Sequence, residues 1–360
     1  MSNKILNIGV IVAGIDEEYQ FNIIEGINRF AQEYNANISY FTAFGGILGN
    51  TNYDIGEYNI FNLVNYKKFD GIVFLNNTIS SPEIQTDIIH KVQSANIPTV
   101  VFDSSKTPEF YNIAIDNFKA MEDIVKHIVE VHNVTKINYV SCPMENPESL
   151  QRYEAYLSVL KSHNIEIEPE RIHIGEFRAI DGREAAEKFV NSELEFPEAI
   201  ICANDAMALS LINTLERYGI KVPDDVLVTG FDNIYMARNF SPEITTVDRP
   251  LNQLGFKACD MIRRICRKEK IPKNHVVFTK PIFSESCGCK HKDVQTDIRK
   301  LKKENYSMIE SCNFNISLLN KMNSELADSE SLEKNMNIIN KFLEEVNCNN
   351  FYLCLCSNWS

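Results

Sequence analysis

The stretch AIICANDAMAL at residues 199–209 contains the repeating unit from which the fold is built. Its first five residues are apolar and include two β-branched isoleucines, a composition typical of a short buried strand. Asn204 and Asp205 follow directly, and such residues at the end of a strand can cap the next helix. A strand that passes through a polar turn into a helix is half of a βαβ unit, so this stretch predicts an α/β fold.

The same alternation of short apolar runs and amphipathic helices extends from the N-terminus to about residue 285. In the helix predicted at residues 20–34, Ile23, Ile24, Ile27 and Phe30 are spaced to form one buried face. The predicted strands are residues 8–12, 38–42, 71–75, 99–103, 137–141, 172–175, 199–203 and 226–231. This number of strands fits two successive α/β units.

Beyond residue 289 the chain contains no Gly or Pro, and its apolar residues follow a heptad spacing. Steps of three and four residues connect Ile298, Leu301, Asn305, Met308, Cys312, Asn315, Leu319, Met322 and Leu326. This spacing is typical of the seam of a two-stranded coiled coil, and a helix packed on its own protein is the alternative. A further helix is predicted around residues 332–343, and the apolar run after Asn350 resembles the first strand of another domain.

Composition argues against several classes of protein. The chain has 36 Lys and Arg against 49 Asp and Glu, a net charge of −13, which would repel a phosphate backbone. The apolar run at residues 8–12 is too short for the core of a signal peptide, and no stretch has the roughly 18 apolar residues of a membrane span. We therefore expect a cytoplasmic protein with no membrane segment and no direct binding of nucleic acid.

No catalytic, metal-binding or cofactor motif is complete. Cys287, Cys289 and His291 form C-x-C-x-H, but no second ligand pair follows at the usual spacing, so a strand end with reduced thiols is preferred. His127 and His132 lie in HIVEVH, which is not H-E-x-x-H and is interpreted as a solvated helix face. There is no nucleophile elbow, Walker loop or G-x-G-x-x-G, so neither an enzyme nor a cofactor is predicted.

Pairs of polar residues follow three of the apolar runs. They are Asp116 with Asn117, Asn204 with Asp205, and Asp232 with Asn233. Each pair can cap a helix, but the carboxyl ends of parallel strands are also where ligands bind in α/β folds. Three pairs in two units predict a polar cleft between the units.

At this point the sequence closely resembles the ligand-binding core of the lac repressor (LacI) family over about residues 5–289. The matching motifs are IGVIV at 8–12 with Gly26, FDGIVF at 69–74, IPTVVFD at 97–103, IAIDN at 113–117, QRYEAY at 151–156, AIICANDAMAL at 199–209, GIKVPDDVLVTGFDN at 219–233 and SPEITTVDRP at 241–250. The resemblance implies two Rossmann-like parallel-sheet lobes, the periplasmic binding protein type 1 fold, with a C-terminal helical or coiled-coil extension.

The resemblance also implies how the chain is divided. The ligand-binding domain would span residues 1–289, with an N-lobe of about 5–115 plus 249–272 and a C-lobe of about 116–245 plus 275–289. A helical linker would follow at 290–347, and the start of a truncated domain at 348–360.

Roles for seven residues follow from the same resemblance. Tyr19 would stack on the ligand, Asp116 would accept hydrogen bonds from ligand hydroxyls, and Arg152 would make a forked polar contact. Phe177 would act as an aromatic lid. The remaining ligand-binding positions would be Asn204, Asp232 and Arg249.

Two positions depart from the family pattern. Arg249 stands where a neutral polar residue is expected, which leaves room for an acidic ligand, and Gly14 replaces a frequent Asp.

The N-terminus is the largest departure, because the first strand starts near residue 5 and no helix-turn-helix or hinge helix precedes it. Residues 53–75 and ESCGC at 285–289 resemble sensor modules that precede GGDEF (diguanylate cyclase) domains, AraC-type DNA-binding domains or histidine kinases. The implied protein is a homodimeric sensor in which a sugar or nucleoside-like ligand closes the two lobes. A C-terminal output domain would respond to this closure, and a diguanylate cyclase is the favoured output. The alternatives are a ligand-responsive transcriptional regulator of the LacI or AraC-fused type, and an enzyme using clustered Asp and His.

Overall fold

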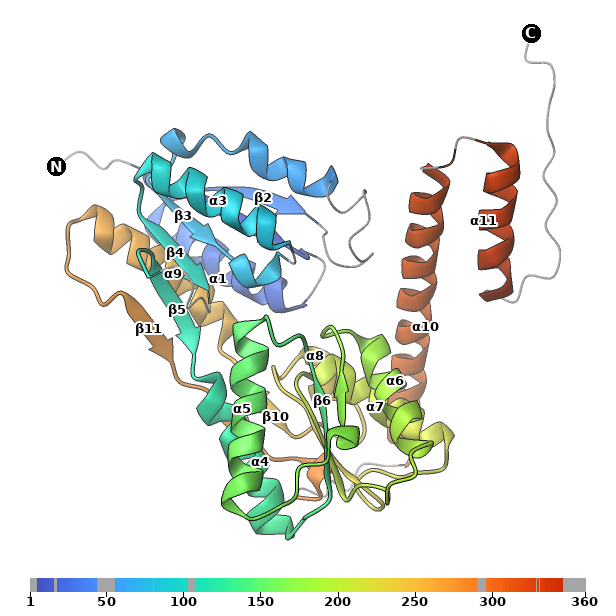
Figure 1. The fold of residues 1–360 in the computed structure, drawn as a ribbon. Coiled ribbons are helices and arrows are strands. Elements are labelled where there is room, and N and C mark those ends of the chain that lie inside the picture. Colours follow the sequence, from blue (N-terminus) through green and yellow to red (C-terminus); the bar gives the residue numbers. More distant parts are fainter. Residues whose placement is uncertain are drawn as a thin grey trace.

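The computed structural model describes residues 5–15, 18–43, 56–79, 81–102, 108–289, 296–327, 329 and 331–345. Figure 1 shows two α/β lobes stacked one above the other, with a long helix running along one side. Both lobes contain a parallel sheet, so the predicted α/β fold with two parallel-sheet lobes is confirmed.

The N-lobe is built on a six-stranded sheet in which every neighbouring pair is parallel. Its order is β11 (Asn274–Val277), β5 (Tyr111–Ile115), β4 (Thr99–Phe102), β3 (Gly71–Phe74), β1 (Asn7–Ala13) and β2 (Asn37–Ala43). Side chains of β1 alternate between two cores, because Val10 packs in one apolar cluster and Ile11 in the other. The first cluster includes helices α1 (Glu18–Tyr34) and α9 (Leu251–Cys266), and the second includes α3 (Pro82–Ala95).

Helices α1 and α9 approach each other closely because each has a glycine at the crossing. A Cβ atom added to Gly26 would lie 1.9 Å from the carbonyl oxygen of Asn252, and one added to Gly255 would lie 2.0 Å from that of Ile23.

We expect Gly26→Ala to lower the free energy of unfolding by about 1–3 kcal/mol, because the added methyl forces the two helices apart. Chemical denaturation measures this change. Gly56→Ala is the matched control, since no atom lies within 4 Å of its added Cβ. Equal stability of the two variants would show that the helix crossing is looser than described.

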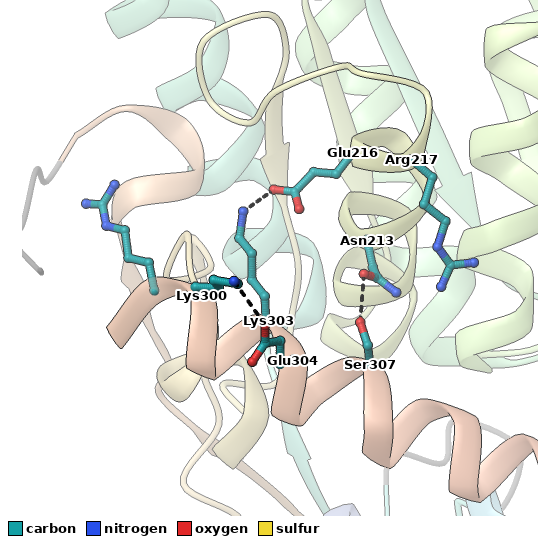
Figure 2. Close-up of a pocket in the computed structure, with 8 residues that line it drawn as sticks. Asn213, Glu216, Arg217, Lys300, Lys303, Glu304 and Ser307 are labelled. Carbon is teal, nitrogen blue, oxygen red and sulfur yellow. Dashed lines mark hydrogen bonds and ion pairs between the residues drawn. The ribbon is translucent and has the colours of Figure 1, made fainter. Parts of the chain in front are cut away.

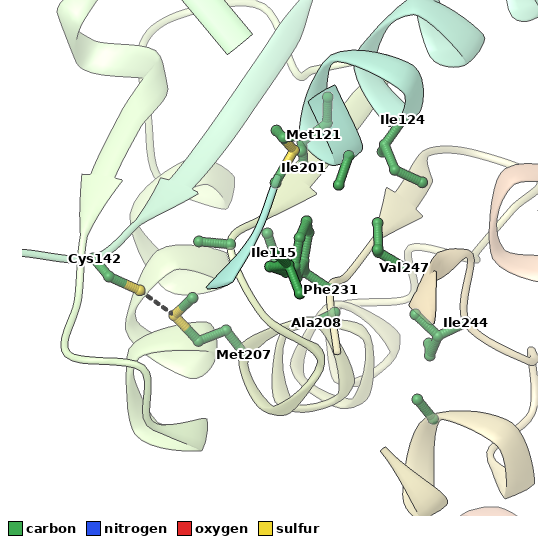
Figure 3. Packing of buried hydrophobic residues seen from close by; sticks show 14 of the residues in the cluster. Ile115, Met121, Ile124, Cys142, Ile201, Met207, Ala208, Phe231, Ile244 and Val247 are labelled. Carbon is green, nitrogen blue, oxygen red and sulfur yellow. Dashed lines mark hydrogen bonds between the residues drawn. The ribbon is translucent and has the colours of Figure 1, made fainter. Parts of the chain in front are cut away.

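The C-lobe is built on a four-stranded parallel sheet in the order β7 (Ile172–Ile174), β6 (Ile137–Ser141), β8 (Ala199–Cys202) and β9 (Leu227–Thr229). Around it lie α4 (Asn117–His132), α5 (Pro147–Ser162), α6 (Ala179–Val190), α7 (Asp205–Arg217) and the short α8 (Tyr235–Asn239). Figure 3 shows the core of this lobe, where Met121 of α4, Ile201 of β8 and Phe231 converge.

Within the described residues the chain crosses between the lobes after β5, before α9 and after β11. β10 (Thr246–Asp248) and β12 (Lys280–Ile282) pair antiparallel beside two of these crossings. β11 still belongs to the N-lobe, so the last crossing comes later than the expected residue 275. The strands β10, β11 and β12 were not predicted, and β5 entered the sequence analysis only as the apolar run before Asp116.

Helix α10 (Thr296–Ala327) packs on the C-lobe through a face that the heptad pattern does not mark. Tyr306 is 6% exposed and its ring lies edge-on to that of Phe240 at 5.0 Å. Farther along, Leu318 of α10 and Phe342 of α11 (Leu332–Glu345) are buried where α11 folds back beside α10.

The heptad seam is exposed from Ile298 to Leu319, with Met308 at 63%, and Met322 and Leu326 are partly buried. The helix therefore does pack on its own protein while its seam remains accessible. Residues 348–360, the predicted start of another domain, lie outside the described residues. Among the described helices, none combines the length and apolar character needed to cross a bilayer.

Candidate functional site

Glu148 is one of the residues through which the two lobes contact each other. It lies in the first turn of α5, where Asn146 caps the helix, and it is 5% exposed. Its Oε1 accepts a hydrogen bond from Asn77 Nδ2 of the N-lobe at 2.8 Å. Its Oε2 lies 2.8 Å from Arg152 Nη2 and 3.0 Å from Arg249 Nη1. One carboxylate thus joins two guanidinium groups and a side chain of the opposite lobe.

Arg152, one helical turn after Glu148, is held on all sides by the C-lobe. Its Nε donates to Asn117 Oδ1 at 3.0 Å and its Nη1 to the carbonyl oxygen of Ala203 at 2.7 Å. The guanidinium carbon lies 3.8 Å from the ring centroid of Phe231, a cation–π contact. With an exposed fraction of 1%, Arg152 forms the floor of the site.

Arg249 links two further predicted residues, Asp232 and Tyr19, to Glu148. It lies in the crossing before α9, and its Nη1 donates to Asp232 Oδ1 at 2.9 Å. Its guanidinium carbon lies 4.8 Å from the ring centroid of Tyr19, whose hydroxyl accepts a hydrogen bond from Asn77 Nδ2 at 2.9 Å. Tyr19, Asn77, Glu148 and Arg249 therefore form a closed ring of contacts with members from both lobes. We call this ring, together with Arg152 and Asp232, the interlobe network.

Asp232 has an unusual backbone. Its φ of 113° lies in a region that non-glycine residues rarely adopt, and such strain is concentrated at functional sites. Burial raises the pKa of Asp232 above its ordinary value, while the guanidinium groups of Arg249 and Arg152 act in the opposite direction. Asp205 supports this loop, because its carboxylate accepts hydrogen bonds from Thr246 Oγ1 at 2.7 Å and from the Ile234 amide at 2.9 Å.

Comparison with known proteins identifies the family. A model of the periplasmic binding protein-like domain matches residues 125–287. The HTH-type transcriptional regulator RegA of Clostridium acetobutylicum is 31% identical over 286 residues, which cover 78% of this chain and 81% of RegA. The chain belongs to the LacI family. The HTH-type transcriptional repressor PurR of Mannheimia succiniciproducens is 28% identical over 271 residues, 74% of this chain and 77% of PurR.

Solved structures of LacI-family proteins have the same fold. The transcription regulator CcpA of Lactococcus lactis aligns with a TM-score of 0.67 at 22% identity, covering 79% of this chain and 99% of CcpA. The lac repressor dimer bound to operator aligns with a TM-score of 0.67 at 17% identity, covering 79% of this chain and 82% of the repressor.

Of the seven residues that the LacI-family resemblance selected, four lie in the interlobe network: Tyr19, Arg152, Asp232 and Arg249. Asn204 and Phe177 form a separate pair, because Asn204 Nδ2 donates to the Phe177 carbonyl oxygen at 2.8 Å. Asn204 Oδ1 also caps α7 by accepting from the Met207 amide at 2.9 Å. The backbone of Phe177 is left-handed, with a φ of 67°.

Asp116 is the exposed cap of α4, and its Oδ1 accepts from the Lys119 amide at 2.8 Å. In the described part of the chain no hydrogen bond joins its side chain to the interlobe network, although the next residue, Asn117, contacts Arg152. A ligand role for Asp116 remains a prediction.

Sequence analysis missed Glu148 and Asn77. Nothing in the sequence marks a Glu in the first turn of a helix as buried, because acidic residues there ordinarily face solvent and the helix dipole. The interpretation of HIVEVH as a solvated face is wrong for His127 and His132. Both are half-buried, and their Nε2 atoms lie 3.1 and 3.4 Å from Cys289 Sγ.

Proposed function

We propose that this chain senses a small molecule that binds between its lobes, at the interlobe network, and alters their closure. The interlobe network is the observation that carries this proposal. Its members come from both lobes, so a ligand that contacts them interacts differently with the open and the closed state, and this difference is what shifts a conformational equilibrium.

A buried acceptor supports ligand binding at this place. Asn77 Oδ1 is buried and has no hydrogen-bond partner among the described residues, although Asn77 Nδ2 has two. A buried polar atom in this condition costs about 1–3 kcal/mol, a cost that a ligand donor would remove.

The charges of the interlobe network favour an uncharged ligand. The guanidinium groups of Arg152 and Arg249 already face the carboxylates of Glu148 and Asp232. The aromatic ring of Tyr19 offers a surface on which a ligand can stack. Phe177 is a second aromatic residue, and its backbone carbonyl is bonded to Asn204. This combination suits a sugar or a nucleoside better than an acidic compound. Arg249 is the residue that would bind the acid group of an acidic ligand.

We further propose that lobe closure reaches a C-terminal output through α10. Glu310 of α10 accepts hydrogen bonds from Ser210 Oγ at 2.8 Å and from Asn213 Nδ2 at 2.7 Å, both on α7. Figure 2 shows the adjoining pocket, where Lys303 pairs with Glu216 and Ser307 bonds to Asn213. Because Asn204, a predicted ligand-binding residue, caps the N-terminus of α7, this helix connects a predicted ligand contact to α10.

The output that we favour is regulation of transcription in the cytoplasm, because the relatives RegA and PurR are named as transcriptional regulators. The exposed heptad seam supports a homodimer. A diguanylate cyclase output and the absence of direct nucleic-acid binding remain predictions from the sequence.

A thermal shift screen of the full chain tests the ligand proposal. We expect at least one member of a panel of sugars and nucleosides to raise Tm, because a ligand at one hundred times its Kd stabilises the folded state by about 2.7 kcal/mol. Charged sugar phosphates in the same panel test the preference for neutral ligands. If no compound raises Tm at millimolar concentration, the proposal is wrong.

A further inference from the structure

Two cysteines and two histidines that are far apart in the sequence meet at one point of the C-lobe. His127 and His132 lie on the last two turns of α4, and Cys287 and Cys289 follow β12. The ligand atoms of these four side chains all lie within 4.8 Å of one another. The missing second pair of the C-x-C motif is thus supplied by a helix about 160 residues earlier in the chain.

Four of the six distances between the ligand atoms are close to the edges of a coordination tetrahedron, and the other two are no more than 4.8 Å. Zinc bonds of about 2.0–2.1 Å to nitrogen and about 2.3 Å to sulfur give edges of about 3.3 Å between two nitrogens and about 3.6 Å between nitrogen and sulfur. The two Nε2 atoms are 3.2 Å apart. The nitrogen to sulfur distances are 3.1 and 3.8 Å from His127 to Cys289 and Cys287, and 3.4 Å from His132 to Cys289.

Local structure holds each side chain in place. The ring of His127 stacks on Phe283 at 3.6 Å between centroids, and His132 is the last residue of α4 before the left-handed Asn133. Gly288, with a φ of 81°, turns the chain so that Cys287 and Cys289 both face the histidines, and the Cys289 amide donates to the Ser284 carbonyl oxygen at 3.2 Å. Burial lowers the pKa of both histidines, which favours the neutral imidazole that binds metals.

We propose that His127, His132, Cys287 and Cys289 bind one zinc ion. Two imidazole nitrogens and two thiolates are a ligand set typical of structural zinc, and four protein ligands leave no open position for catalysis. On binding, each thiol releases its proton to solvent and the thiolate forms the bond to the metal.

The position of the site suggests what the metal does. It ties α4, the first helix of the C-lobe, to the segment that leads from β12 toward α10. Two residues before Cys287, Glu285 accepts a hydrogen bond from the Glu243 amide at 2.8 Å and contacts Arg299 Nη2 of α10 at 3.4 Å. Zinc would therefore fix the point at which the chain leaves the ligand-binding domain, independently of which ligand the cleft binds.

Metal analysis of the untagged full chain, purified under reducing conditions and loaded with zinc, tests this proposal. We expect about one zinc per chain by mass spectrometry of the metal, and less than about a tenth of that in Cys289→Ser, because two-His, one-Cys sites bind zinc more weakly. Cys289 is exposed, so this change disturbs packing least. Cys312→Ser, at an exposed cysteine of α10, is the control and should keep its zinc.

Cobalt substitution of the unaltered chain gives a readout that does not depend on a variant folding. Tetrahedral Co²⁺ with two thiolates should show intense visible ligand-field bands and a thiolate-to-cobalt charge-transfer band in the near ultraviolet. Weak octahedral bands, zinc content no higher than in Cys289→Ser, or a Cys287–Cys289 disulfide in the reduced preparation would each overturn the proposal.

Discussion

Replacing Arg152 with alanine is expected to lower the free energy of unfolding by about 3–5 kcal/mol, the largest stability loss that we foresee. The guanidinium is 1% exposed and bonds to Glu148, Asn117 and the Ala203 carbonyl oxygen. Its removal takes one of two guanidinium partners from the buried Glu148 carboxylate and the donor from the buried Ala203 carbonyl oxygen, and it empties the space over Phe231.

Urea denaturation followed by circular dichroism measures this loss. Arg264→Ala is the matched control, because Arg264 forms an ion pair with Glu269 at 2.8 Å but is about one third exposed. A surface ion pair of this kind contributes little to stability. If Arg152→Ala is no less stable than the control, Arg152 is not the buried organiser of the C-lobe that the contacts indicate.

The regular part of the fold could be predicted because burial leaves a strong pattern in the sequence. The runs at 8–12 and 199–203 became β1 and β8, since strands covered on both faces are continuously apolar. β10 and β12 have three residues each and include polar positions, so their local sequence carries no comparable signal.

The heptad pattern of α10 predicted a helix but did not identify the residues through which this helix contacts the C-lobe. The heptad spacing marks the exposed seam of α10, whereas the contacts with the C-lobe depend on Tyr306 and Glu310. A single aromatic residue and a single Glu among many polar residues do not form a periodic stripe. Their partners Phe240 and Ser210 lie 66 and 100 residues earlier in the chain, so only the tertiary structure reveals the contact.

The site was predicted in part for a similar reason. The LacI-family motifs located Arg152, Asp232 and Arg249, and the family resemblance located Tyr19 by its place after the first strand. The two residues that close the interlobe network, Asn77 and Glu148, belong to no motif. Their hydrogen bond spans 71 residues and joins the two lobes. The four proposed zinc ligands could not be predicted together for the same reason. The C-x-C spacing of Cys287 and Cys289 gives no information about a histidine pair on a distant helix.

Arg249→Ala is expected to weaken binding of the best sugar or nucleoside from the thermal shift screen by about ten- to one hundredfold. Hydrogen bonds to a charged group contribute about 1.5–3 kcal/mol, and each 1.4 kcal/mol corresponds to tenfold in Kd. Arg249 also holds Asp232 and lies over the ring of Tyr19, so its removal disturbs three members of the interlobe network together.

The control for this variant is Arg238→Ala. Arg238 also reaches across the lobes, to Glu18 at 3.8 Å, but it is half exposed at the rim and lies outside the interlobe network. We expect its effect on Kd to be below about fivefold, as for other exposed ion pairs. The comparison therefore separates contact with the ligand from a general loosening of the lobes.

Isothermal titration of that ligand into the unaltered chain, Arg249→Ala and Arg238→Ala is the most direct test of binding in the interlobe cleft. The account predicts one site per chain, with affinity lost in Arg249→Ala and retained in Arg238→Ala. Equal affinity in all three proteins would place the ligand elsewhere and contradict it.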